Sequence, residues 1–92
     1  SAEEQRRYLI GKGTSVKELL YAIVADLVDN KDAIEITADE PDAEGVTVYH
    51  LHVAPDDMGR VIGKQGRIAK AIRTIMRAGA ARLEQKVAVE ID

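Results

Sequence analysis

The chain has 92 residues, with 16 acidic and 13 basic side chains, a formal net charge of −3 and no cysteine. This length fits one domain with a modest core, and the lack of cysteine excludes disulfides and thiolate metal sites and favours a reducing compartment. Three tyrosines are the only aromatic residues, which argues against a protein that binds nucleic acid by stacking bases on aromatic rings. No apolar run reaches the ~20 residues that cross a membrane, so we expect a cytoplasmic protein without membrane contact.

Residues 1–15 show no sustained hydrophobic period, and we expect a mobile N-terminal tail followed by one domain over residues 16–92. The segment Gly11-Lys12-Gly13-Thr14 matches only part of a phosphate-binding P-loop. The first glycine of that motif is missing at the required spacing, and no strand precedes the segment. We therefore expect no nucleotide site here.

Residues 16–29 repeat apolar side chains at spacings of three and four, which is the period of a helix with one buried face. Ser15, with Glu18 three residues later, fits a capping box at the start of this helix. We expect the helix to pack on the core through Val16, Leu19, Leu20, Ile23, Val24, Leu27 and Val28.

Two alternating segments, residues 33–37 and 46–54, predict strands, and the polar turn between them predicts a hairpin. His50 and His52 lie on one face of the second strand, at a spacing where two imidazoles can share a metal. No third ligand is evident nearby, so we expect no metal site and favour a protein contact on this face.

Pro55, Asp56 and Asp57 predict the end of the strand and the start of a short helix, with the aspartates as helix caps. No histidine, lysine or nucleophile stands at a telling distance from these carboxylates, so we expect no enzyme and no cofactor. A break at Gly63-Lys64-Gln65-Gly66 separates this short helix from a long helix that reaches about residue 83. Residues 86–91 alternate as a third strand.

The long helix has two contrasting faces and lies in a basic region. Residues 58–83 contain seven basic residues and no acidic one, whereas residues 1–57 contain 13 acidic and 5 basic residues. At about 100° per residue, one face carries Arg67, Lys70, Arg73 and Arg77, and the opposite face, which we expect in the core, carries Ile68, Ile72, Ile75, Met76 and Leu83. A solvated face usually mixes both signs of charge, so the missing carboxylates favour an anionic partner.

The two glycines of the break allow another backbone to come close, and the unpaired N–H groups of the following helix favour anions there. The segment Val61-Ile62-Gly63-Lys64-Gln65-Gly66-Arg67 resembles the Val-Ile-Gly-x-x-Gly core of KH domains. In that family the GxxG loop clamps about four nucleotides of single-stranded nucleic acid. One position differs from many KH motifs, which place an isoleucine three residues after the second glycine, where this chain has Ala69.

The expected order of elements also resembles the bacterial, type II KH fold, an α+β arrangement of the order αββααβ. Its three-stranded sheet is covered on one face by three helices. The resemblance spans about residues 16–92 and points to the bacterial single-KH-domain KhpA family. It implies single-stranded RNA held by a site made of Arg60, Ile62, Gly63, Lys64, Gln65, Gly66, Arg67, Ile68 and Lys70, in which the basic side chains and loop N–H groups hold phosphates and the isoleucines form an apolar floor.

The resemblance further implies a homodimer, or a heterodimer with a larger KH-containing protein, that acts as an RNA chaperone or post-transcriptional regulator. The small residues within 73–81 and the His50/His52 face are candidate surfaces, although small residues also serve packing within one chain. The alternative function is a protein-interaction adaptor with little RNA binding. A second interpretation of residues 1–15 is a translated leader before a natural start near Val16, which the intact mass of the native protein would test.

Overall fold

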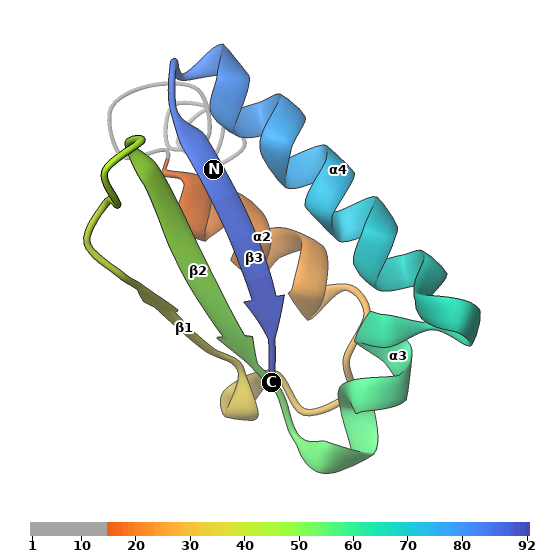
Figure 1. Cartoon of the computed structure of the whole chain (residues 1–92). Coiled ribbons are helices and arrows are strands. Elements are labelled where there is room, and N and C mark those ends of the chain that lie inside the picture. The colour runs from red at the N-terminus through yellow and green to blue at the C-terminus, as the bar shows by residue number, and fades with distance from the viewer. Residues whose placement is uncertain (1–14) are drawn as a thin grey trace, which may run out of the picture.

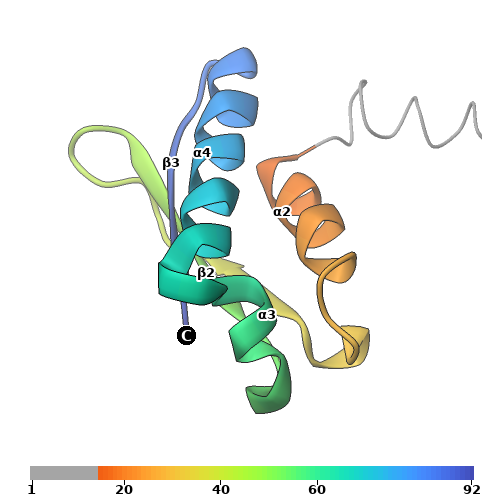
Figure 2. The same ribbon diagram turned by 90° about the vertical axis from the view of Figure 1, so that its right-hand side faces the viewer.

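The computed structural model describes residues 15–92 as one sheet with helices on one of its faces (Figures 1 and 2). The sheet contains β1 (Glu35–Ala38), β2 (Val46–His52) and β3 (Lys86–Ile91), and the helical layer contains α2 (Val16–Ala25), α3 (Met58–Ile62) and α4 (Arg67–Arg82). This confirms the predicted α+β arrangement of type II. Within residues 15–92, no helix combines the length and the apolar character that a membrane span requires.

Strand β2 lies at the centre of the sheet, antiparallel to β1 and parallel to β3. Tyr49, for example, pairs with Ala38 on one side and with Val89 on the other. The β1–β2 hairpin is therefore as predicted. A parallel pair needs a long crossover connection, which here consists of α3, the loop at residues 63–66 and α4. Within residues 15–92, the outer strands β1 and β3 each pair on one side and leave the other edge free.

The core lies between the sheet and the helices, as the alternation of β2 predicts. Leu51 is fully buried and the neighbouring His52 is exposed, so one face of β2 supports the core. The other fully or nearly fully buried apolar side chains come from every helix and from the outer strands, and they include Val16, Leu20, Val24, Ile36, Val61, Ile72, Met76, Val87 and Val89.

Helix α2 is shorter than the predicted 16–29. Ser15 caps it as expected, because Ser15 Oγ accepts a 3.1 Å hydrogen bond from the backbone N–H of Glu18. At the other end the N–H groups of Leu27 and Val28 both donate to the carbonyl of Val24, at 2.9 and 3.1 Å. This tight turn ends the helix but still directs Val28 into the core. A 3₁₀ turn at Lys31–Ala33 then delays the first strand, predicted at 33–37, to Glu35–Ala38.

The predicted core face of α4 is partly wrong. Ile68, Ile75 and Leu83 are 36%, 46% and 42% exposed, and the buried positions are instead Ala69, Ile72, Met76 and Ala80. The helix turns its small side chains inward because its neighbours lie close. A Cβ atom at Gly79 would lie 2.5 Å from Leu19 Cδ2 on α2, so Gly79 and Ala80 serve packing within the chain.

The predicted capping role of Asp57 is also wrong. Its carboxylate makes no cap hydrogen bond to α3 and is buried, with 1% exposure. The two oxygens instead accept hydrogen bonds from the backbone N–H groups of Asp29 and Asn30, at 3.1 and 3.0 Å. Asp57 thus joins the turn after α2 to the start of α3, because its buried carboxylate needs hydrogen-bond donors and the N–H groups of this turn supply them.

Candidate nucleic-acid interface

The GKQG loop, residues 63–66, is a tight turn between α3 and α4, as predicted. The backbone φ angles of Gly63, Gln65 and Gly66 are +74°, +58° and +74°, in the region that glycine adopts most easily. The N–H of Gly66 donates a 3.1 Å hydrogen bond to the carbonyl of Gly63, which closes the turn. The loop thus follows directly from its two glycines.

The two glycines differ in their surroundings. A Cβ atom at Gly63 would lie 2.3 Å from Cγ1 of Ile68, so Ile68 packs directly over the loop backbone. A Cβ atom at Gly66 would meet no atom of residues 15–92 within 4 Å. Gly66 therefore leaves open space at the N-terminus of the 16-residue helix α4, where unpaired N–H groups and the helix dipole favour an anion.

The basic side chains at this end of α4 are exposed. Arg67 Nη2 donates a 3.2 Å hydrogen bond to Gln65 Oε1, which holds both side chains over the loop. Among residues 15–92, no carboxylate forms an ion pair with Lys64, Arg67 or Lys70. Their positive charge is therefore directed to solvent beside Gly66.

Arg60 lies in a different environment from these three residues. Its Nη1 is 2.8 Å from Asp57 Oδ1, and its Nη2 is 3.1 Å from Asp29 Oδ2. The backbone N–H groups of Asn30 and Asp29 hold the pKa of Asp57 below its ordinary value, and Arg60 adds to that effect. The guanidinium thus balances two carboxylates, a contact that sequence reasoning missed because Asp29 lies 31 positions away along the chain.

Ile62 and Ile68 flank the loop and are 37% and 36% exposed. Both isoleucine side chains are thus available at the surface, next to the exposed basic side chains. The structure brings together the nine residues that the sequence singled out, since all of them lie on α3, the GKQG loop or the first turns of α4. Where both partners lie within residues 15–92, Arg60 is the one member of this set that pairs with carboxylates.

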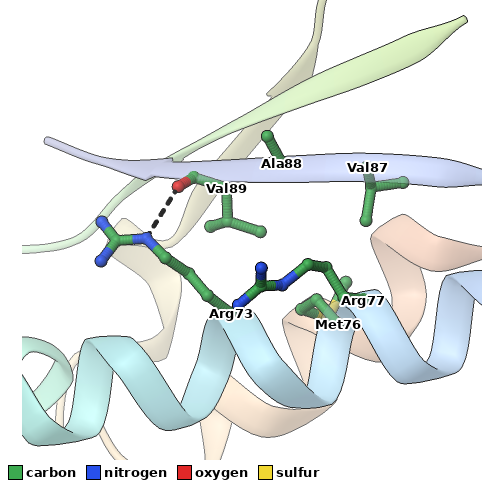
Figure 3. A pocket seen from close by; sticks show the side chains of 6 residues that line it. All are labelled: Arg73, Met76, Arg77, Val87, Ala88 and Val89. Atoms are coloured by element: carbon green, nitrogen blue, oxygen red, sulfur yellow. Dashed lines mark hydrogen bonds between the residues drawn. The ribbon is translucent and has the colours of Figure 1, made fainter.

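A groove of about 320 Å³ lies between α4 and the free edge of β3, and the sequence did not predict it. Arg73, Met76 and Arg77 line it from the helix, and residues 87–89 line it from the strand (Figure 3). Arg73 Nε donates a 3.1 Å hydrogen bond to the carbonyl of Val89. The available signal was the basic stripe on α4, but only the folded chain places that stripe against β3.

The buried side of α4 therefore separates two exposed flanks. On one flank, which faces β3, lie Arg73 and Arg77. On the other flank, at helical positions about 140° or more away from these arginines, lie Ile68 and Ile75. A partner on the apolar flank would leave the basic groove uncovered.

His50 lies on the sheet face that carries no helix, between the two outer strands. Its Nε2 is 2.8 Å from Asp39 Oδ2, and its Nδ1 is 3.3 Å from Glu90 Oε2. The hydrogen bond with Asp39 raises the pKa of His50, and the charge of Glu90 adds to this rise. Both ring nitrogens are thus used by carboxylates rather than directed at a site shared with His52.

The chain matches proteins of one family over nearly all of the described region. The family model for the KH domain of KhpA/KhpB matches residues 17–91. A protein of Clostridium acetobutylicum named RNA-binding protein KhpA is 49% identical over 76 residues, which are 83% of this chain and 99% of that protein. Proteins of the same name from Caldanaerobacter subterraneus and Aquifex aeolicus are 50% and 41% identical, over 80% and 85% of this chain and 96% of each relative.

The fold also occurs in solved structures of a larger protein. Aquifex aeolicus Era bound to GDP and aluminium fluoride superposes with a TM-score of 0.60 and 19% identity, over 83% of this chain and 29% of that one. A structure of Era with a nucleotide and a segment of 16S ribosomal RNA gives a TM-score of 0.59. At this identity the likeness concerns the fold alone.

From the family model and the relatives, the chain belongs to the KhpA/KhpB family of KH domains.

Proposed function

We propose that the chain binds single-stranded RNA, without catalysing a reaction, through the GKQG loop and the basic flank of α4. The observation that carries this proposal is the open space at Gly66, at the N-terminus of a long helix and beside three exposed cations. A phosphate can approach the backbone there without meeting a side chain. The relatives named RNA-binding protein KhpA support the same function.

The geometry of the loop and the groove supports one path for the RNA. Lys64, Arg67 and Lys70 hold phosphates near the loop, and Ile62 and Ile68 contact bases. Arg60 contributes less than these residues, because Asp57 and Asp29 already balance its charge. From the loop, the strand of RNA continues along α4 toward the groove against β3.

The test is fluorescence anisotropy of a short labelled single-stranded RNA at increasing salt. The variant Lys64→Asp with Gln65→Asp places two carboxylates in the loop, and we expect it to abolish binding. The matched control is Gln85→Asp with Lys86→Asp, which makes the same change of charge at the far end of α4, roughly 24 Å away. If both folded variants bind like wild type, the loop is not the RNA site, and an adaptor for other proteins is the better interpretation.

We further propose that the chain self-associates through the apolar flank of α4, or pairs through it with a larger KH-containing protein. Two weak RNA sites on one dimer would raise avidity, which suits an RNA chaperone or post-transcriptional regulator. Ile75 is 46% exposed and centres this flank. We expect Ile75→Glu to shift the sedimentation coefficient to that of a monomer while circular dichroism stays unchanged, whereas Thr74→Glu, which makes the same change of charge at an exposed position about 100° away on α4, would retain the dimer. A wild-type monomer at all concentrations would contradict self-association.

A further inference from the structure

A second groove lies at the edge of the sheet that β1 forms. Its volume is about 630 Å³, and it lies between α2 and β1. Tyr21 and Ala22 line it from the helix, and Ile34 and Ile36 line it from the start of the strand. Because β2 separates β1 from β3 (Figure 1), this groove and the basic groove of α4 lie at opposite edges of the sheet. A ligand in one groove therefore leaves the other groove open.

The free edge of β1 presents backbone groups in the arrangement that a further strand needs. The N–H of Asp39, just after β1, donates to the carbonyl of Val48 on β2, and the two strands are antiparallel. In such a pair, the residues of each strand alternate between those bonded to the partner and those directed away from it. The N–H and carbonyl groups of Ile36 and Ala38 are therefore directed away from β2. Within residues 15–92, no other strand pairs with β1.

Apolar side chains form much of the groove wall, and they indicate what an added strand would carry. Tyr21 is 45% exposed, and Ala22 is exposed as well. Directly paired residues of neighbouring strands place their side chains on the same face, so the residues opposite Ile36 and Ala38 would direct their side chains toward α2. Aliphatic side chains at these two positions would remove the apolar wall from water.

Carboxylates lie on both faces of the β1 edge. On the groove side, Glu18 Oε2 is buried, and no group of residues 15–92 donates a hydrogen bond to it. A buried acceptor normally has a donor. On the helix-free face, Glu35 and Asp39 are exposed, and Asp39 also contacts His50. Lys17 lines the groove too, but the three carboxylates outnumber it and favour a basic partner.

We propose that the β1 edge binds an extended segment of a partner protein, in which two aliphatic residues flank a lysine or arginine and a further basic residue follows two positions later. The segment joins the sheet as a fourth strand by bonding to the backbone groups of Ile36 and Ala38. Its aliphatic side chains enter the groove and its second basic residue donates to Glu18. The central basic side chain lies between Glu35 and Asp39. This docking site does not depend on the proposed RNA function.

The probe for this site is the acetylated and amidated heptapeptide Arg-Thr-Val-Arg-Val-Thr-Arg, added to the full chain without RNA. Amide chemical shifts of the ¹⁵N-labelled protein locate the peptide, and anisotropy of the labelled peptide gives its affinity. One control peptide carries N-methyl groups on both valines, which removes the backbone donors and keeps the charge. A second control replaces each arginine with glutamate. The protein variants are Glu18→Gln and its matched control Asp26→Asn, a change at an exposed residue just after the same helix.

We expect the heptapeptide to shift the amides of Ile36, Ala38 and the groove-lining part of α2, and to leave those of residues 63–66 unchanged. The N-methylated peptide should bind wild type at least about five-fold more weakly. The original peptide should bind Glu18→Gln at least about five-fold more weakly, because a charge-assisted hydrogen bond is lost, and should bind Asp26→Asn as tightly as wild type. The glutamate peptide should not bind.

Several results would overturn the docking site. They are no binding of the heptapeptide, shifts confined to other surfaces, or undiminished affinity of the N-methylated peptide, the glutamate peptide or the Glu18→Gln variant. None of these results bears on the RNA site, because Glu18→Gln should bind the labelled RNA as wild type does. A failure of RNA binding at the GKQG loop would likewise leave the docking site at the β1 edge intact.

Discussion

Each glycine of the GKQG loop makes its own contribution to stability. Gly63 combines φ +74° with ψ 174° and lies against Ile68, whereas Gly66 has the left-handed helical values +74° and 15° and open space. We expect Gly63→Ala to cost about 2–4 kcal/mol, because backbone strain and overpacking both act. Gly66→Ala should cost only about 1 kcal/mol. Urea unfolding measures both values, and equal costs would contradict the close contact between Gly63 and Ile68.

The variant Gly66→Ala separates an effect on RNA binding from an effect on stability. The new methyl group of Gly66→Ala would occupy the space that we assign to a phosphate. We therefore expect this well-folded variant to lose RNA affinity, measured by anisotropy at a protein concentration and temperature at which circular dichroism shows it folded. Undiminished affinity would place the phosphate elsewhere.

The buried carboxylate of Asp57 makes a second contribution to stability at the scale of single residues. Asp57→Asn removes the charge that attracts Arg60 and weakens acceptance from two backbone N–H groups. We expect a lower urea midpoint with an unchanged slope, whereas Asp56→Asn, a change at the exposed neighbour, should leave the midpoint unaltered.

Because the folded pKa of Asp57 is lowered, its stabilisation is present above the unfolded pKa and is lost as pH falls through the folded pKa. The gap between wild type and Asp57→Asn should accordingly close in acid.

At the scale of elements, His50 links β2 to the turn after β1 and to β3. Its folded pKa is raised above 6.5, so the charged imidazole stabilises the sheet at pH values below 6.5. This contribution is lost as pH rises through the folded pKa. We expect the melting temperature of wild type to fall relative to His50→Gln between slightly acid and slightly basic pH. The exposed His52, changed to Gln, serves as the control, and parallel profiles for wild type and His50→Gln would contradict the role of the carboxylates.

Helix α4 shows which features of a helix hydrophobic periodicity predicts and which it does not. Its existence, its start after the GKQG loop and its basic stripe follow from local sequence. Its buried face does not, because Ala69 and Ala80 contribute little hydrophobicity to a helical pattern but fit where α4 lies close to its neighbours. The predicted face was therefore rotated toward Ile68 and Ile75, which the fold leaves at the surface.

At the scale of the whole molecule, the charge is bipolar. Residues 58–92 carry 8 basic and 3 acidic residues, and the acidic excess lies in residues 1–57. Under the proposed function, this distribution orients an RNA toward the basic residues and repels it from the acidic ones. We expect Lys70→Gln to reduce the slope of log K against log salt by about 0.7, the value for one lost contact to a single strand.

The matched control for this slope is Lys31→Gln, which removes the same charge from the acidic part of the chain. Salt titrations by anisotropy should give it the slope of wild type. If both variants reduce the slope equally, net charge rather than a phosphate contact at Lys70 governs binding.

Local sequence determined the order of elements, the hairpin, the tight glycine loop and the basic helix, because each depends on the period of apolar residues or on the backbone freedom of glycine. The tail expected over residues 1–15 lies, apart from Ser15, outside the described residues. Tertiary structure alone decided which flank of α4 faces β3, which carboxylates balance Arg60 and where Asp57 directs its oxygens. Those outcomes depend on groups far apart in sequence, whose approach is set by the packing of the helices on the sheet rather than by any local pattern.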